Sequence, residues 1–115
     1  MFCAISAITL SSAASDFGTL QGVTTDQQGA IVQDVQVRIV CWGIDKLHRS
    51  VVAKEARLST GPKGEYSIEL PHGGCDVFFS HSLFEPVAKR VRIEAEKNIV
   101  LNVTMKFGRH IKFIE

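Results

Sequence analysis

Two turn-bounded runs within residues 59–79 constrain the fold of this chain most strongly. Apolar and polar residues alternate from Tyr66 to Leu70 and again from Cys75 to Phe79. Glycine and proline bound both runs, at residues 61–64 and 71–74. Alternation with a period of two, bounded by turn residues, is typical of half-buried antiparallel strands. We therefore expect two hairpin turns here, in an all-β protein.

The same alternation recurs along most of the chain. It predicts strands at residues 17–25, 35–41, 86–93 and 99–107, with a further hairpin turn at Ala95–Asn98. About seven strands with turn residues about every ten positions are typical of an immunoglobulin-like sandwich. The sequence therefore predicts a seven-stranded antiparallel Greek-key β-sandwich, of immunoglobulin or prealbumin type.

The segment at residues 50–58 is compatible with two structures. Its Glu, Ala, Lys and Arg content allows about two turns of helix. Alternation instead places Val52, Lys54 and Leu58 on one side of a strand, and a lysine at an inward position is how edge strands block pairing with another chain. We favour the edge strand.

Length and charge exclude several classes of protein. The chain has 115 residues, 45% of them hydrophobic and 22% charged, which suits one packed domain. Its formal net charge is +1, and no block of like charges occurs. A field that would attract nucleic acid is therefore absent, and we expect no nucleic-acid partner.

Residues 1–15 differ in composition from the rest. They contain no charged residue, and an apolar run is followed by small residues at 11–15. This layout is typical of a secretory signal peptide cleaved after Ala14 or Ser15, although no basic residue precedes the run. The alternative is a hydrophobic N-terminal strand or helix. The run is too short to span a membrane, so we expect no membrane insertion. We expect export to the periplasm, cell surface or medium, a domain at 17–107 and a short tail at 108–115.

Cleavage of that segment would leave two cysteines, Cys41 and Cys75. An even pair in an exported protein suggests one disulfide. Both cysteines also fall at predicted inward positions, where a free thiol packs as a small apolar group. A disulfide and two buried thiols therefore both remain open.

Three motifs of turn glycines and alternating apolar residues resemble those of the carboxypeptidase regulatory-like domain. That family has the turns D-x-x-G, T-D-x-x-G-x-Y/F and L-P-x-G-x-Y-x-V in this order. The matching residues are Asp26 and Gly29; Thr60, Gly64 and Tyr66; and Leu70, Pro71, Gly73 and Val77. The chain departs from the family at Gly61, where an acidic residue is usual, and at Cys75, where an aromatic is usual.

The resemblance extends over residues 18–107 and implies a transthyretin-like sandwich. Such domains are usually accessory modules, found beside peptidase domains, at the front of outer-membrane receptors or in cell-surface proteins. Related sandwiches bind starch or other carbohydrate. The resemblance therefore implies a non-enzymatic exported module with a binding or structural role.

Trp42 and Phe78 are the candidate ligand-stacking residues. Alternation places both, together with Val40, on the outward side of their strands. An exposed aromatic patch can stack on sugar rings or dock a protein partner. This pattern makes a carbohydrate-binding module the alternative function. A covering loop, or the tail residues Ile111–Phe113, would instead bury the patch.

The histidines give the second alternative, a small hydrolase. His48, His72, His81 and His110 all fall in predicted loops or at strand ends. No two have the spacing of a metal-binding pair, and no Gly-x-Ser-x-Gly motif occurs. We therefore expect solvated histidines, no metal, no cofactor and no catalytic residue.

Overall fold

The computed structural model describes residues 16–108, in which all regular elements are strands. There are eight strands in this part of the chain. They are β1 (Phe17–Asp26), β2 (Gln36–Ile44), β3 (Ser50–Ser59), β4 (Glu65–Pro71), β5 (Gly73–His81), β6 (Phe84–Ile93), β7 (Asn98–Val100) and β8 (Val103–Met105). Residues 50–59 are a strand and not a helix, as expected.

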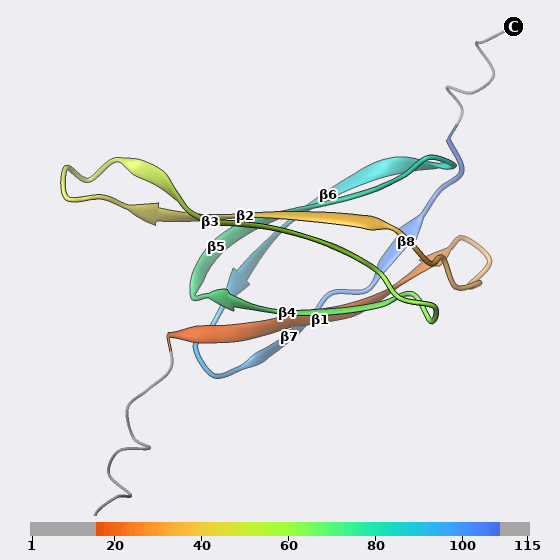
Figure 1. Cartoon of the computed structure of the whole chain (residues 1–115), viewed down its shortest axis with the longest axis horizontal. Coiled ribbons are helices and arrows are strands. Elements are labelled where there is room, and N and C mark those ends of the chain that lie inside the picture. Colours follow the sequence, from red (N-terminus) through yellow and green to blue (C-terminus); the bar gives the residue numbers. More distant parts are fainter. Residues whose placement is uncertain (1–15, 109–115) are drawn as a thin grey trace, which may run out of the picture.

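The strands form two sheets that lie as separate layers (Figure 1). One sheet has the order β4-β1-β7, with β8 also paired to β1, and the other has the order β3-β2-β5-β6. The predicted all-β sandwich is confirmed. Its pairing is antiparallel except that β7 and β8 run parallel to β1.

The strand number differs from the prediction because the expected strand at 99–107 is interrupted. It forms β7 and β8, with Leu101 and Asn102 between them. Ile99 and Leu101 still pack against the core, and Val103 is buried. Since the inward alternation continues across the break, the sequence pattern could not reveal it.

The expected hairpins at 61–64, 71–74 and 95–98 are wrong. Each of these turns crosses from one sheet to the other, because β4 and β7 pair with β1 while β3, β5 and β6 belong to the second sheet. The hairpins are instead β2–β3 and β5–β6. Glycine and proline permit a sharp change of direction but do not determine the partner of the following strand.

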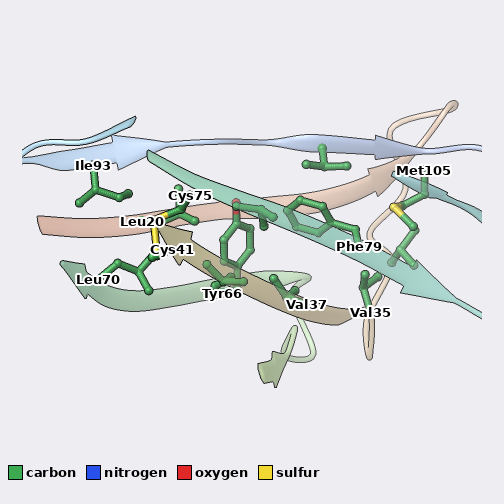
Figure 2. Close-up of a cluster of buried hydrophobic side chains, with 14 of the residues drawn as sticks. Leu20, Val35, Val37, Cys41, Tyr66, Leu70, Cys75, Phe79, Ile93 and Met105 are labelled. Carbon is green, nitrogen blue, oxygen red and sulfur yellow. A yellow bond between two sulfur atoms is a disulfide. The ribbon is translucent and has the colours of Figure 1, made fainter. Parts of the chain in front are cut away.

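The core lies between the two sheets and contains the predicted inward residues. Val35, Val37 and Ile39 are buried, as are Cys75, Val77 and Phe79. The rings of Tyr66 and Phe79 meet edge to face with centroids 5.7 Å apart (Figure 2). An edge-to-face arrangement of this kind is a favourable aromatic contact.

A polar residue of β1 occupies a core position. Val23 is only partly buried, and its neighbour Thr24 is fully buried on the side of Leu20. The Thr24 hydroxyl donates to the carbonyl oxygen of Val32 at 2.7 Å. This hydrogen bond offsets the cost of burying the hydroxyl. A pattern of apolar residues alone does not predict such a buried polar side chain.

Tyr66 fixes the interruption between β7 and β8. Its hydroxyl donates to the carbonyl oxygen of Leu101 at 2.5 Å, while the amide of Leu101 donates to Gln21 at 2.8 Å. A Cβ on Gly22 would collide with the Leu101 carbonyl. The backbone at Leu101 therefore crosses close over β1, and only glycine leaves room for it.

The β3-β2-β5-β6 sheet has lysines at inward register positions of both its edge strands. Lys54 of β3 stands opposite Cys41, and Lys89 of β6 stands opposite Val77. Both lysines are exposed at the sheet margins. A charge on the inner side of an edge strand disfavours pairing with another chain, as expected for Lys54.

Candidate functional site on the outer face of the second sheet

The candidate stacking residues lie on the β3-β2-β5-β6 sheet, on the side that faces away from the core. This side is called the outer face. Neighbouring strands place arginines, acidic side chains and aromatic rings in three rows across it. The rows are Arg57, Arg38, Phe78 and Ala88; Glu55, Val40, Asp76 and Arg90; and the two pairs Val52–Trp42 and Gly74–Arg92. A register shift between Cys41 and Trp42 puts Val52 opposite Trp42, so Val52 does not share the inward side with Lys54 as expected.

Trp42 is exposed over 41% of its surface and is held in place by a hydrogen bond. Its indole Nε1 donates to Oδ2 of Asp76 on the neighbouring strand at 2.8 Å. Asp76 in turn accepts two hydrogen bonds from the Arg90 guanidinium, at 2.9 Å and 3.2 Å. The indole is therefore an ordered aromatic surface, so little side-chain entropy remains to be lost on binding.

Asp76 is charged under ordinary conditions. The hydrogen bonds from Arg90 and then from Trp42 lower the pKa of its carboxyl below the ordinary value of 3.8. Hydrogen bonds donated to a carboxylate favour its charged form. Arg90 lies on the opposite side of Asp76 from Trp42, so the three side chains form a continuous polar connection from β2 to β6.

A hollow of about 350 Å³ lies beside the indole. It is lined by Trp42, Ser50, Gly74 and Arg90. Gly74 lies inside β5, and a Cβ added there would meet no atom within 4 Å. The hollow is therefore open above Gly74, where no side chain projects from the strand.

Phe78 lies in a separate part of the outer face. The Arg38 guanidinium carbon is 5.6 Å from the centroid of its ring, and Arg38 pairs with Glu55 at 2.8 Å. A second hollow of about 300 Å³ adjoins Phe78. Two aromatic positions with separate surroundings are therefore present, where the sequence suggested one patch.

Val40 does not belong to an exposed patch. It faces outward between the two aromatics, yet only 6% of its surface is exposed. The surrounding outward side chains therefore cover it, so it adds no contact surface between Trp42 and Phe78. The alternative in which tail residues cover the aromatics involves positions outside 16–108, the described residues.

Cys41 and Cys75 are joined by a disulfide in the structure (Figure 2). They stand directly opposite one another on β2 and β5, so the bond links neighbouring strands of one sheet rather than the two sheets. Both are buried on the inner side. Trp42 and Asp76 follow them in the sequence and project from the other side of the same two strands.

The histidines are distributed over different ends of the sheet. His72 directly precedes β5, His81 is the last residue of that strand, and His48 lies in the β2–β3 loop. His81 accepts a hydrogen bond at Nδ1 from the Leu83 amide and contacts Phe84. Within residues 16–108 no group of three or more His, Cys, Asp or Glu could hold a metal ion. His110 lies outside the described residues.

Sequence reasoning missed three residues of the site, namely Gly74, Asp76 and Arg90. Alternation does place Asp76 outward, since it lies between two inward residues of β5. Its contacts to Trp42 and Arg90 depend on which strands are neighbours, and the pattern along one strand does not contain that information. Gly74 was interpreted only as part of a turn.

Comparison with known proteins identifies the fold of this chain but no family to which it belongs. No family model matches the chain, and no curated protein matches it. No helix within residues 16–108 is long and apolar enough to cross a membrane.

The chain is similar to several solved structures at low sequence identity. Catechol 1,2-dioxygenase from Acinetobacter radioresistens superposes with a TM-score of 0.65 and 12% identity, over 86% of this chain and 54% of the enzyme. The Bacillus anthracis TIE protein gives 0.62 and 12%, over 81% of this chain and 17% of that protein. A streptococcal ancillary pilin gives 0.62 and 13%, over 81% and 33%.

These similarities establish a shared β-sandwich fold. The chain spans about half the length of the dioxygenases that it matches. An identity of 12% shows common architecture and does not transfer an activity.

Proposed function

We propose that this chain is a non-enzymatic, exported accessory module that binds a partner through its outer face. The observation that carries this proposal is the ordered and exposed indole of Trp42, bonded to Asp76 and through it to Arg90. A tryptophan with one apolar face in solvent and its polar edge occupied is a residue type that dominates binding surfaces.

The family assignment belongs to the same proposal. The three turn motifs that resemble the carboxypeptidase regulatory-like domain lie at real turns, with Gly29, Gly64 and Gly73 at positive φ. Positive φ is the conformation for which a turn requires glycine. The β-sandwich supports the resemblance, and the pilin and TIE neighbours are compatible with an accessory role.

Carbohydrate binding is the second candidate function. The observation that favours it is the hollow beside Trp42 with glycine at its base. The C–H face of a sugar ring is apolar and flat, so it can lie against an indole, while its hydroxyls hydrogen-bond to polar groups at the edge.

Affinity electrophoresis through gels that contain a neutral or an acidic polysaccharide tests the binding function. We expect retardation of the wild type in at least one gel and its loss in Trp42→Ala. Val100→Ala is the matched control, since Val100 is exposed on the other sheet. Equal mobility of the wild type and Trp42→Ala in every gel would contradict polysaccharide binding through this face and leave a protein partner or a structural role.

N-terminal sequencing of the secreted protein tests export. We expect the mature chain to begin directly after Ala14 or Ser15. Recovery of a protein that retains Met1 would contradict the signal peptide.

A further inference from the structure

We propose that the hollow beside Trp42 is a subsite for an acidic sugar, a uronic acid residue of a polysaccharide. This inference rests on the proposed binding function and names its ligand class. Three features of the outer face carry it, namely the open glycine floor, the fixed indole wall and an arginine whose charge is not neutralised.

Gly74 forms the floor without any structural need for glycine. A Cβ there would meet nothing within 4 Å, and its φ lies outside the left-handed region, unlike that of Gly73. Glycine inside a strand weakens the strand and often marks a point where a ligand approaches the backbone closely. A ring can therefore lie over Gly74 in contact with the sheet.

Trp42 and Asp76 provide the wall and the polar edge. The indole is exposed, and its hydrogen bond to Asp76 sets its orientation beside the floor. Asp76 uses both carboxylate oxygens for Trp42 and Arg90, yet a carboxylate has about four acceptor sites. Free acceptor capacity therefore remains for the hydroxyl groups of a sugar.

Arg92 supplies the charge that selects an acid. It stands opposite Gly74 in the register of β5 and β6, and it is exposed. Among the described residues no side-chain partner pairs with its guanidinium, whereas Arg90 is paired with Asp76 and Arg38 with Glu55. Arg92 does not line the hollow itself, but its unpaired guanidinium on the strand next to Gly74 is complementary to the carboxylate of a ring lying over that glycine.

The outer face as a whole carries a net positive charge, like Arg92 itself. Four arginines and two acids project from its rows, and the acids are already engaged by Arg38, Arg57 and Arg90. A neutral sugar would leave the excess positive charge unused. A ligand with one carboxylate per ring, stacked on the indole over Gly74, uses the floor, the wall and Arg92 together.

Titration with oligogalacturonate tests the proposal, with a neutral cello-oligosaccharide of equal length as the comparison. Trp42 is the one tryptophan of the chain, so its fluorescence reports this site alone. We expect a saturable change with the acidic ligand that weakens as salt is added, because exposed charges are screened. Arg92→Gln should weaken binding about tenfold, as for loss of one charge-assisted hydrogen bond.

Two variants locate the site. Gly74→Leu should abolish binding while the thermal unfolding midpoint stays near that of the wild type, since a Cβ there meets no atom within 4 Å and the rest of the side chain enters the hollow. Arg57→Gln is the matched control, because it removes an arginine of the same face at the distant edge strand. It should change the affinity less than about twofold, in line with a screened remote charge.

The other outcomes separate the two proposals. Equal binding of acidic and neutral oligosaccharides, lost in Trp42→Ala, would overturn the preference for an acid and support carbohydrate binding. Binding of a polyglutamate peptide but of neither sugar would overturn the sugar subsite and support a protein partner on the same face. Binding of none of the three would contradict both carbohydrate binding and the subsite.

Discussion

The indole Nε1 of Trp42 donates to Oδ2 of Asp76 across the β2–β5 strand pair at 2.8 Å. The disulfide between Cys41 and Cys75 joins the same two strands on their inner side. A covalent bond below the sheet and a hydrogen bond above it therefore fix one point of the pair. The two strands are therefore held together next to the hollow, at the position where Trp42 lines it.

Asp76→Asn should alter the acid stability of the fold. The folded pKa of Asp76 is lowered, chiefly by Arg90, so its contribution to stability is present above the unfolded pKa. That contribution is lost as the pH falls through the folded pKa, below 3.8. We expect Trp42 fluorescence of the wild type to change with a midpoint below pH 3.8 and this transition to be absent from Asp76→Asn.

Glu55→Gln is the control for this titration. Hydrogen bonding from Arg38 lowers the pKa of Glu55 in the same way, but Glu55 does not contact the indole. The fluorescence transition should therefore persist in Glu55→Gln. Persistence of the transition in Asp76→Asn as well would show that global acid unfolding, and not Asp76, produces the signal.

The disulfide should stabilise the fold through the loop that it closes. The cysteines are 34 positions apart, and for a loop of this length reduction should lower the free energy of unfolding by about 3–4 kcal/mol. Urea denaturation of the wild type with and without reductant measures the difference. In the unreduced, unfolded protein iodoacetamide should label neither Cys41 nor Cys75. Labelling of both would exclude the bond.

Alanine at two glycines of the strands should have opposite effects. Gly22→Ala should destabilise the fold by about 3 kcal/mol, because the new Cβ meets the Leu101 carbonyl, which the backbone cannot easily move. Gly74→Ala should raise the free energy of unfolding by about 0.5 kcal/mol, since glycine is costly inside a strand. Chemical denaturation of both variants checks this, and equal effects would contradict the close approach at Gly22.

Tyr66 is the one tyrosine of the chain, so its ionisation can be followed by absorbance. Burial raises its pKa from the ordinary 10.0 to about 12. Because the folded pKa is the higher one, stability should fall as the pH rises between these values, where only the unfolded chain ionises. A midpoint near pH 10 in the folded protein would contradict a buried hydroxyl.

Tyr66→Phe isolates the hydrogen bond from the burial of the ring. The variant keeps the edge-to-face contact with Phe79 and loses the bond to the Leu101 carbonyl. We expect the free energy of unfolding to decrease by about 1 kcal/mol. An unchanged value would show that the hydroxyl does not hold the segment between β7 and β8.

The sequence predicted inward positions well and neighbour relations poorly. Val37, Val77 and Phe79 were expected inside because each strand has its own period of two, and they are buried. The turns at 61–64 and 71–74 were expected to be hairpins but cross between the sheets, since turn residues do not specify a partner strand. Asp76 and Arg90 were missed for the same reason, because their contacts join different strands.

The indole resonance of Trp42 in a ¹H–¹⁵N correlation spectrum tests the binding face most directly. The chain has one tryptophan, so one indole Nε1–H signal reports the contact with Asp76 and the hollow beside it. We predict that this signal shifts in a saturable manner on addition of oligogalacturonate, together with the amides of Gly74 and Arg92. An indole signal that stays unchanged at saturating ligand concentration would contradict the account.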